Sequence, residues 1–363
     1  MSLQCGIVGL PNVGKSTLFN CLSNAKAQAA NFPFCTIEPN IGVITVPDER
    51  LNELAKLVNP QRILPTTIEI VDIAGLVKGA SKGEGLGNQF LGNIRSTDAI
   101  IHVVRCFEDD NVIHVDGNVD PVRDKEIIDT ELQLKDLDTV EKRLVKVQKG
   151  SDNASKRETE LLNRIKTVLI QGKNAREVLP NNDDEKKLIQ EFQLLTSKPV
   201  LYVCNVDEKS VISGNKLTEK FKTSIASENA GILYICAAIE SEIAQLESFE
   251  DRQMFLEEIG LKDSGVSKLI KEAYRLLGLL TYFTAGVQEV RAWTITEGTK
   301  APQAAAVIHT DFEKGFIRAE VIHLEDYLNF KTEAACRDAG KLNVEGKEYI
   351  VQDGDVMHFR FNV

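Results

Sequence analysis

The segment GLPNVGKST at residues 9–17 constrains the fold of this chain more than any other feature. It fits the pattern GxxxxGK[ST], follows a short apolar run at residues 5–8, and opens a helical pattern. Glycines let such a loop curl, so that its backbone N–H groups and the next helix N-terminus face anionic oxygens. The segment therefore predicts a phosphate-binding loop between a buried strand and a helix. The candidate phosphate-binding residues are Asn12, Val13, Gly14, Lys15, Ser16 and Thr17.

Two side chains of this loop predict a nucleoside triphosphate with a metal ion. Lys15 is placed to bridge the β- and γ-phosphates, and the Ser16 hydroxyl is placed to ligate Mg²⁺. Further along, a predicted strand at residues 66–71 runs into the motif DIAG. There Asp72 can hold Mg²⁺ through a water molecule, and Gly75 can present its N–H to the γ-phosphate.

Two further segments have the character of nucleotide-dependent switches. NFPFCT ends at Thr36, which can close over the nucleotide and give Mg²⁺ its second protein oxygen. Residues 78–87 are so rich in glycine that they should move with nucleotide state. We therefore expect Mg²⁺ as a cofactor, held by Ser16, Thr36 and, through water, Asp72.

Six short apolar runs predict a mainly parallel sheet. In most of them both odd- and even-numbered positions are apolar, which is typical of strands that are buried on both faces of a sheet. Helical patterns lie between several of them, so the fold class is α/β. Ligands should gather at the C-terminal ends of such strands. The runs lie at residues 5–8, 42–46, 67–73, 99–104, 199–204 and 231–236.

The stretch from about residue 129 to 198 is too long for a simple crossover. Apolar residues recur there in two sets at helical spacing, and GSDN at residues 150–153 supplies a turn. This predicts an inserted helical hairpin with Asp129 as its N-cap. Residues 141–176 contain ten Lys or Arg and four acidic residues, which gives this segment a net charge of +6. Such an arm can be steered toward phosphates, but the same balance is typical of solvated helix faces.

The pattern changes in the last quarter of the chain. Alternation at residues 289–296, an apolar run at 304–309, and strand-like runs at 317–322 and 349–361 predict a small β-rich domain. From residue 278 onward, nine basic residues stand against thirteen acidic ones. This balance argues against a generic RNA-binding surface.

Composition limits the partners and the compartment. Lys plus Arg total 43 and Asp plus Glu total 54, a formal charge of -11, so no overall polycation favours nucleic acid. Seven scattered cysteines without a CxxC pair are typical of reduced thiols. No basic signal-peptide region opens the chain, and no apolar run approaches the roughly 20 residues of a membrane span. We expect a soluble, cytoplasmic monomer with no membrane partner.

The order of the phosphate-binding loop (P-loop), Thr36, DIAG at residues 72–75 and NVDE at residues 205–208 resembles a translation-factor-class GTPase. GLPNVGKST, DIAGLVKGA, LGNIRSTDAIIHVVRCF and the C-terminal region together resemble the YchF-type, Obg-related NTPases over essentially the whole chain. The resemblance implies an OBG-type, Ras-like G domain at residues 1–277, with a helical insertion at about 129–198, and a β-grasp TGS domain at residues 278–363. It also implies a translation-associated switch that binds the ribosome, its large subunit or RNA.

The base-reading motif departs from the GTPase pattern. GTPases carry NKxD, whose aspartate accepts from N1–H and N2–H₂ of guanine, whereas this chain has NVDE. Adenine has an acceptor at N1, so an aspartate placed for guanine would face a lone pair. ATP is therefore favoured over GTP, as the resemblance also implies. Asn205 can hold the base or support the P-loop, the Val206 backbone can read the adenine edge, and Glu208 completes the candidate nucleotide-binding set.

Hydrolysis should be slow without help. Leu76 stands where Ras-like enzymes place a glutamine that orients the attacking water, and leucine accepts no hydrogen bond. Lys15 is the expected catalytic charge, and His114, after the apolar run at residues 99–104, is the nearest candidate for positioning water. A surface histidine without a role is the alternative. Related GTPases with asparagine at the position of Asn12 can use K⁺ to supplement the positive charge, so the resemblance adds K⁺ as a candidate cofactor.

Two alternatives to an ATPase switch stay open. The chain can be a GTPase of the same fold, or a nucleotide-responsive RNA- or ribosome-binding scaffold with incidental turnover. A metabolic P-loop kinase is disfavoured, because the threonine and DIAG switches would have no role in it.

Overall fold

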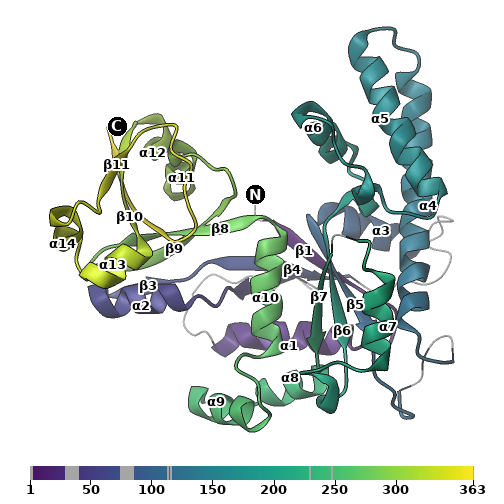
Figure 1. Cartoon of the computed structure of the whole chain (residues 1–363), viewed down its shortest axis with the longest axis horizontal. Helices are drawn as coiled ribbons and strands as arrows, with labels where there is room; N and C mark the ends of the chain where they lie inside the picture. Colours follow the sequence, from purple (N-terminus) through teal and green to yellow (C-terminus); the bar gives the residue numbers. More distant parts are fainter. Residues whose placement is uncertain are drawn as a thin grey trace. The chain divides into compact units, whose positions relative to one another are not determined.

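The computed structural model describes residues 3–28, 41–73, 86–112, 114, 117–228, 230–246 and 248–362. The chain forms two compact units, one from residues 1–43 and 69–269 and the other from residues 44–68 and 270–363. Figure 1 labels the helices and strands of both units.

The first sheet is mainly parallel. Its strands are β1 Gln4–Val8, β2 Ile41–Thr45, β4 Thr67–Asp72, β5 Ala99–Arg105, β6 Val200–Asn205 and β7 Gly231–Ile235, in the order β2-β4-β1-β5-β6-β7. The pairs β1–β4, β1–β5, β5–β6 and β6–β7 are all parallel. Every residue of β5 and β6 is buried, as expected of central strands that are covered on both faces. The predicted α/β class is confirmed.

Helices connect these strands or follow the last of them. They are α1 Lys15–Gln28, α3 Leu86–Ser96, α4 Pro121–Val147, α5 Asn153–Ile170, α6 Asp183–Phe192, α7 Lys216–Ser224, α8 Ala237–Ile243, α9 Phe249–Glu258 and α10 Gly265–Leu276. Short 3-10 turns lie at Ala175–Glu177, Leu195–Ser197 and Glu208–Ser210. Among the described residues, no helix is long and apolar enough to cross a membrane.

The predicted helical hairpin is formed by α4 and α5, which extend beyond the first sheet (Figure 1). α4 begins at Pro121, because Asp120 Oδ1 accepts from Val122 N at 3.1 Å and proline suits the first helical position. The predicted N-cap at Asp129 is therefore wrong. Asp129 lies inside α4, where its carboxylate accepts from Lys125 Nζ at 2.7 Å.

An apolar seam holds α5 against α4. Asp152 caps α5 by accepting from Ser155 N at 2.8 Å, so the predicted turn at residues 150–153 ends where α5 begins. Burying each leucine of the seam stabilises the hairpin by roughly 1.5–3 kcal/mol. The buried residues at its centre are Val140, Leu144, Leu161, Leu162, Ile165 and Leu169.

The second sheet is mixed. Its strands are β3 Arg62–Leu64, β8 Leu279–Ala285, β9 Glu289–Thr296, β10 Phe316–His323, β11 Asn343–Glu345 and β12 Asp355–Phe361, in the order β11-β10-β12-β8-β9-β3. β8–β9, β10–β11 and β10–β12 are antiparallel, whereas β12–β8 and β3–β9 are parallel. The strand expected at residues 349–361 begins only at Asp355, because Asp355 N donates to Gln352 O in a turn at 3.2 Å.

The helices of the second unit are α2 Glu49–Val58, α11 Ala301–Ile308, α12 Thr310–Lys314, α13 Leu324–Phe330 and α14 Glu333–Asp338. The apolar run at residues 304–309 thus belongs mostly to α11, which packs on the sheet. The assignment of this unit to the TGS class stays a prediction.

The compact units divide the chain differently from the domain boundary expected between residues 277 and 278. Residues 44–68 belong to the C-terminal unit. Leu51 and Leu54 of α2 share a buried apolar cluster with Phe283 of β8. This packing joins segments more than 200 residues apart in sequence, which local patterns do not reveal.

Candidate nucleotide-binding site

The loop between β1 and α1 has the backbone that the P-loop motif requires. Asn12 has φ 63° and Gly14 has φ 93°, so the chain is left-handed at both positions. A Cβ on Gly14 would lie 2.3 Å from Asn205 Nδ2. One on Gly9 would lie 2.7 Å from Val103 O. Only glycine fits at these two positions, and the loop curls tightly before the N-terminus of α1, where N–H groups favour anions.

Lys15 and Asp72 meet beside this loop. Lys15 Nζ lies 2.5 Å from Asp72 Oδ1, and their side chains are 9% and 17% exposed. Ile7 lies opposite Asp72 in the β1–β4 ladder, so strand order places the carboxylate next to the P-loop. Ser16 is exposed on the first turn of α1. The site thus combines an ammonium, a carboxylate and a hydroxyl around the helix N-terminus.

These residues fit Mg²⁺ with a triphosphate. Mg²⁺ prefers oxygen ligands and keeps several waters and phosphate oxygens, so the protein needs to supply only one or two groups. Ser16 and Asp72 are oxygen donors of this kind. Where the structure describes the chain, no cluster of three or more His, Cys, Asp or Glu could hold a metal by itself.

Asn205 ties the base-reading motif to the P-loop. Its Nδ2 donates to Val13 O at 2.9 Å, and its Oδ1 accepts from Ala237 N at 3.0 Å. The side chain therefore supports the P-loop, the second of the two roles considered for it. A contact between Asn205 and the base stays a prediction.

Val206 and Glu208 differ sharply in environment. Val206 is buried, and its N–H donates to Ile235 O at 2.9 Å, so this N–H is not available to an adenine edge. Glu208 is exposed, without a hydrogen-bond or ion-pair partner among the described residues. Asp207 accepts from Ser210 N at 3.0 Å and from Ser210 Oγ at 2.9 Å, so it caps the 3-10 turn.

The cysteines near this motif are buried and free. A hydrogen bond with Cys106 and burial raise the pKa of the Cys204 thiol far above its ordinary range. Burial also raises the pKa of the Cys236 thiol. These thiols stay protonated at neutral pH, which makes them poor metal ligands and nucleophiles.

His114 is not the exposed loop residue that was the alternative to a catalytic role. Its side chain is 4% exposed, and Nε2 donates to Asp124 Oδ2 at 2.8 Å. Asp124 lies in the first turn of α4 and is itself buried. The contact with Asp124 therefore fixes the position of His114 beside the first turn of α4. The role of His114 in hydrolysis stays a prediction.

Arg105 is a residue that sequence reasoning missed. It is 2% exposed at the end of β5 and donates to three backbone carbonyls. The acceptors are Phe107 O at 3.1 Å, Asp109 O at 3.2 Å and Val112 O at 2.8 Å. Arg105 thus shapes the loop that leads to His114. A charged residue at the end of an apolar strand was the signal available in the sequence.

Four sequence predictions fall outside the described residues. They concern Thr36 as a Mg²⁺ ligand, Gly75 at the γ-phosphate, Leu76 in place of glutamine, and most of the glycine-rich stretch, residues 78–85.

A mainly parallel sheet, a P-loop after its first strand, and a lysine–aspartate pair at the strand ends define a P-loop nucleoside triphosphatase with a G-domain fold. The Ribosome-binding ATPase YchF of Bacillus subtilis (strain 168) is 56% identical over 368 residues, which cover 100% of each chain. The chain therefore belongs to the YchF family.

Further comparisons agree with this family. The Ribosome-binding ATPase YchF of Escherichia coli O157:H7 is 55% identical over 366 residues, again 100% of each chain. The solved structure of the Schizosaccharomyces pombe YchF GTPase matches with a TM-score of 0.90 at 40% identity, covering 99% of this chain and 98% of that one. A family model described as "50S ribosome-binding GTPase" matches residues 4–149. The C-terminal YchF model, described as "Protein of unknown function (DUF933)", matches residues 279–362.

Proposed function

We propose that this chain is a Mg²⁺-dependent nucleoside triphosphatase that prefers ATP over GTP. It turns over slowly alone and acts as a nucleotide-gated regulatory switch on the ribosome in the cytoplasm, as a monomer. Its G domain spans residues 1–277 by sequence and carries the helical insertion, and its TGS domain spans residues 278–363.

The environment of the base-reading motif is the observation that supports the proposed preference for ATP. Guanine selection needs a free carboxylate where GTPases have aspartate. Here the aspartate of the motif, Asp207, is one position early and already caps Ser210, while Glu208 is one methylene longer and exposed. A guanine would therefore leave its N1–H and N2–H₂ poorly paired, which weakens GTP relative to ATP.

Mg²⁺ and hydrolysis follow from the phosphate site. Ser16 and Thr36 would ligate Mg²⁺ directly and Asp72 through water, while Lys15 would neutralise developing charge on the phosphates. Gly75 would donate its N–H to the γ-phosphate. His114 would position the attacking water, since Leu76 cannot.

Ribosome binding is supported by the names of the relatives and by the tip of the arm. Six of the ten basic residues at positions 141–176 lie within 4 Å of an acidic partner. The other four are exposed and have no ion pair among the described residues. We call them the arm-tip cluster: Lys146, Lys149, Lys156 and Arg157. They flank the turn between α4 and α5, where they can meet RNA phosphates.

The test combines hydrolysis with ribosome pelleting. Wild-type protein should hydrolyse ATP faster than GTP, and its co-sedimentation with ribosomes should differ between ATP and ADP. Lys15→Ala should abolish both the hydrolysis and the nucleotide effect. Ribosome binding that is unchanged by nucleotide and by Lys15→Ala would favour the scaffold alternative. The same hydrolysis assay in K⁺ and in Na⁺ buffer tests whether K⁺ near Asn12 assists hydrolysis. Equal rates in the two buffers would contradict a role for K⁺.

A further inference from the structure

α7 holds both ends of the segment that carries His114. This segment joins β5 to α4, and we call its described residues, 106–112, 114 and 117–120, the His114 loop. At its start, Asn215 Nδ2 donates to Cys106 O at 2.8 Å. At its end, Lys220 Nζ donates to Asp120 Oδ2 at 2.7 Å. Asn215 is the N-cap residue of α7 and Lys220 lies within this helix, which packs beside α4 (Figure 1). One helix thus fixes where the loop begins and where it ends.

Arg105 fixes the interior of the His114 loop. Its side chain is buried, and the three backbone carbonyls that accept from it belong to Phe107, Asp109 and Val112 of the loop. Its guanidinium carbon also lies 4.6 Å from the centroid of the Phe107 ring. No acidic side chain among the described residues forms an ion pair with Arg105. A buried charge is costly unless its hydrogen bonds are satisfied, so the loop is held in the conformation that presents these carbonyls.

Asn215 also connects the His114 loop to the nucleotide site. Its Nδ2 donates a second, longer hydrogen bond to Ser210 Oγ at 3.3 Å, and Ser210 Oγ donates to Asp207 Oδ1 at 2.9 Å, inside the base-reading motif. Cys106 N donates to Asn205 O at 2.8 Å. Because Asn205 is itself bonded to the P-loop, the first residue of the His114 loop is fixed relative to the phosphate-binding backbone.

Asn215 uses different atoms to cap α7 and to hold the loop. Its Oδ1 accepts from Leu217 N and Thr218 N, each at 3.0 Å, which is the capping role. Its NH₂ group makes the bonds to Cys106 and Ser210. Aspartate and serine cap helices about as well as asparagine, but an aspartate carboxylate has no hydrogen to donate and a serine hydroxyl lies one bond nearer to the backbone. Substitution by either residue therefore keeps the cap and removes the bond to the loop.

We propose that Asn215 is a positioning residue for ATP hydrolysis, because its bond to Cys106 fixes the His114 loop, and through it His114, relative to the phosphates. A misplacement of about 1 Å can lower a rate by roughly 10²-fold, so a bond that acts only on position has a measurable effect. The inference rests on the proposed role of His114 in orienting the attacking water. It assigns a function to a residue that the nucleotide-binding motifs do not include.

Single-turnover hydrolysis at saturating ATP and Mg²⁺, together with calorimetric binding of ATP, measures the effects on rate and on affinity separately. Asn215→Asp and Asn215→Ser should each lower the rate by about tenfold and change the Kd for ATP by less than about twofold. The matched control is Asn182→Ser, which alters the N-cap asparagine of α6, whose Oδ1 accepts from Glu185 N at 2.9 Å. It should leave both quantities unchanged. A wild-type rate in either Asn215 variant, with His114→Ala slow, overturns the inference and leaves the role of His114 intact.

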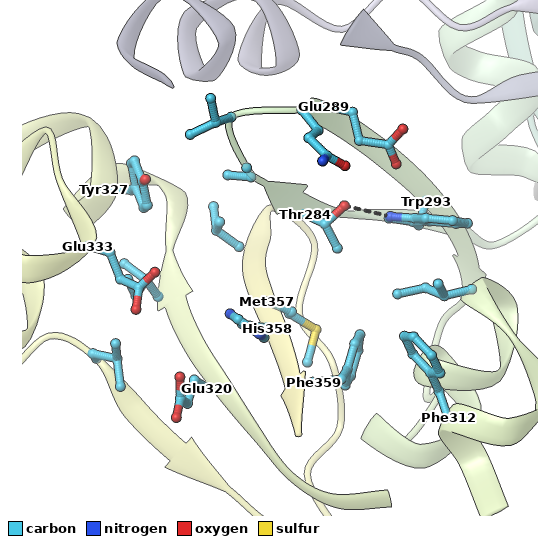
Figure 2. Close-up of a pocket in the computed structure, with 18 of the residues that line it drawn as sticks. Thr284, Glu289, Trp293, Phe312, Glu320, Tyr327, Glu333, Met357, His358 and Phe359 are labelled. Carbon is cyan, nitrogen blue, oxygen red and sulfur yellow. Dashed lines mark hydrogen bonds between the residues drawn. The ribbon is translucent and has the colours of Figure 1, made fainter. Parts of the chain in front are cut away.

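Histidine ring signals in NMR spectra provide a readout that does not depend on hydrolysis. In protein that carries isotope-labelled histidine, the ring signals of His114, assigned by their loss in His114→Ala, should shift in both Asn215 variants. His358 is the internal control, because it belongs to the second unit, where it lines a cavity (Figure 2). Its signals should stay unchanged. Unshifted His114 signals in the Asn215 variants would overturn the inference.

A double variant shows whether Asn215 acts through His114. In the His114→Ala background, Asn215→Ser should change the hydrolysis rate by less than about twofold, because the group that Asn215 positions is already absent. Losses that multiply in the double variant would contradict the inference. A wild-type rate in His114→Ala alone would instead contradict the proposed role of His114, and the inference would fail with it.

Discussion

Asn205 shows how one side chain can couple two parts of a nucleotide site. Its amide bonds to the carbonyl of Val13 in the P-loop and to the N–H of Ala237 at the start of α8. Gly14 must lack a side chain for this amide to approach. A buried amide that meets its partners in this way fixes the distance between the phosphate loop and the base-reading loop. The phosphates and the base of a bound nucleotide would therefore meet binding loops that are held at a fixed distance from each other.

His114→Ala should lower kcat for ATP by roughly 10²-fold while leaving the Kd for ATP unchanged, because a water-positioning group acts on hydrolysis and not on binding. Single-turnover hydrolysis and calorimetry measure the two quantities. Asp124→Asn keeps the shape of the side chain that contacts His114 but weakens the hydrogen bond to the imidazole. The kcat of this variant should therefore lie between those of the wild type and His114→Ala.

Loss of folding has to be separated from loss of catalysis here. His114 is a partner of a buried carboxylate, and its removal can cost about 1–3 kcal/mol of stability. The assays therefore run well below the Tm of each variant. A kcat equal to wild type in folded His114→Ala would assign water positioning to another group.

Buried charges fix the root of the helical arm against the first sheet. Lys125 Nζ of α4 lies 2.7 Å from Asp129 Oδ2 and 2.6 Å from Glu228 Oε1. Tyr202 of β6 donates its hydroxyl to Glu228 Oε2 at 2.8 Å. Such a network fixes the positions of its side chains, because a buried charge that loses its partner strongly lowers the stability of the fold. The arm therefore leaves the sheet in a defined direction, with its tip cluster at the far end.

His102 on β5 makes this network sensitive to acid. Burial lowers its pKa from 6.5 to about 4, with Asp129 and Glu228 opposing the shift and Lys125 and Arg176 adding to it. Between pH 6.5 and 4 the unfolded chain binds a proton that the native state refuses, so stability falls as pH falls. From pH 7 to pH 5, His102 should reduce the free energy of unfolding by about 2 kcal/mol.

Urea unfolding at pH 7 and pH 5 measures this loss. His102→Gln has no titration in this range, so its stability should fall less between the two pH values than that of the wild type. Carboxylates titrate in both proteins and cancel in the comparison. Identical pH dependence in both proteins would remove His102 from the explanation.

The arm-tip cluster predicts a specific loss of ribosome binding. Lys146→Ala, Lys149→Ala and Lys156→Ala together should weaken co-sedimentation with ribosomes by about tenfold near physiological salt, and should reduce the slope against log salt by about 2. The measurement is pelleting over a range of salt concentrations.

A control variant removes the same charge from paired positions. It combines Lys142→Ala, Lys166→Ala and Lys173→Ala, whose partners are Asp138, Glu141 and Glu177. These lysines are already neutralised locally, so binding should change by less than about twofold. Equal losses in both variants would show that net charge, and not the arm tip, decides binding.

Across the whole molecule, local sequence signals predicted local structure well. The P-loop motif and the apolar runs located β1, β5 and β6, because those signals depend on neighbouring residues. Packing between distant segments was not predictable in this way. The placement of residues 44–68 with the C-terminal unit depends on Leu51 and Leu54 meeting Phe283. His114 is buried against Asp124, a contact that no local pattern in the sequence indicated.

The most direct test of an ATP-selective switch is binding itself. We would titrate the purified chain with ATP and with GTP, each with Mg²⁺, by isothermal calorimetry, with Lys15→Ala as the control for binding through the P-loop. We expect ATP to bind at least about tenfold more tightly than GTP, since guanine would leave polar groups unpaired. Tighter binding of GTP would contradict this, and would mean that Glu208 reaches the guanine edge.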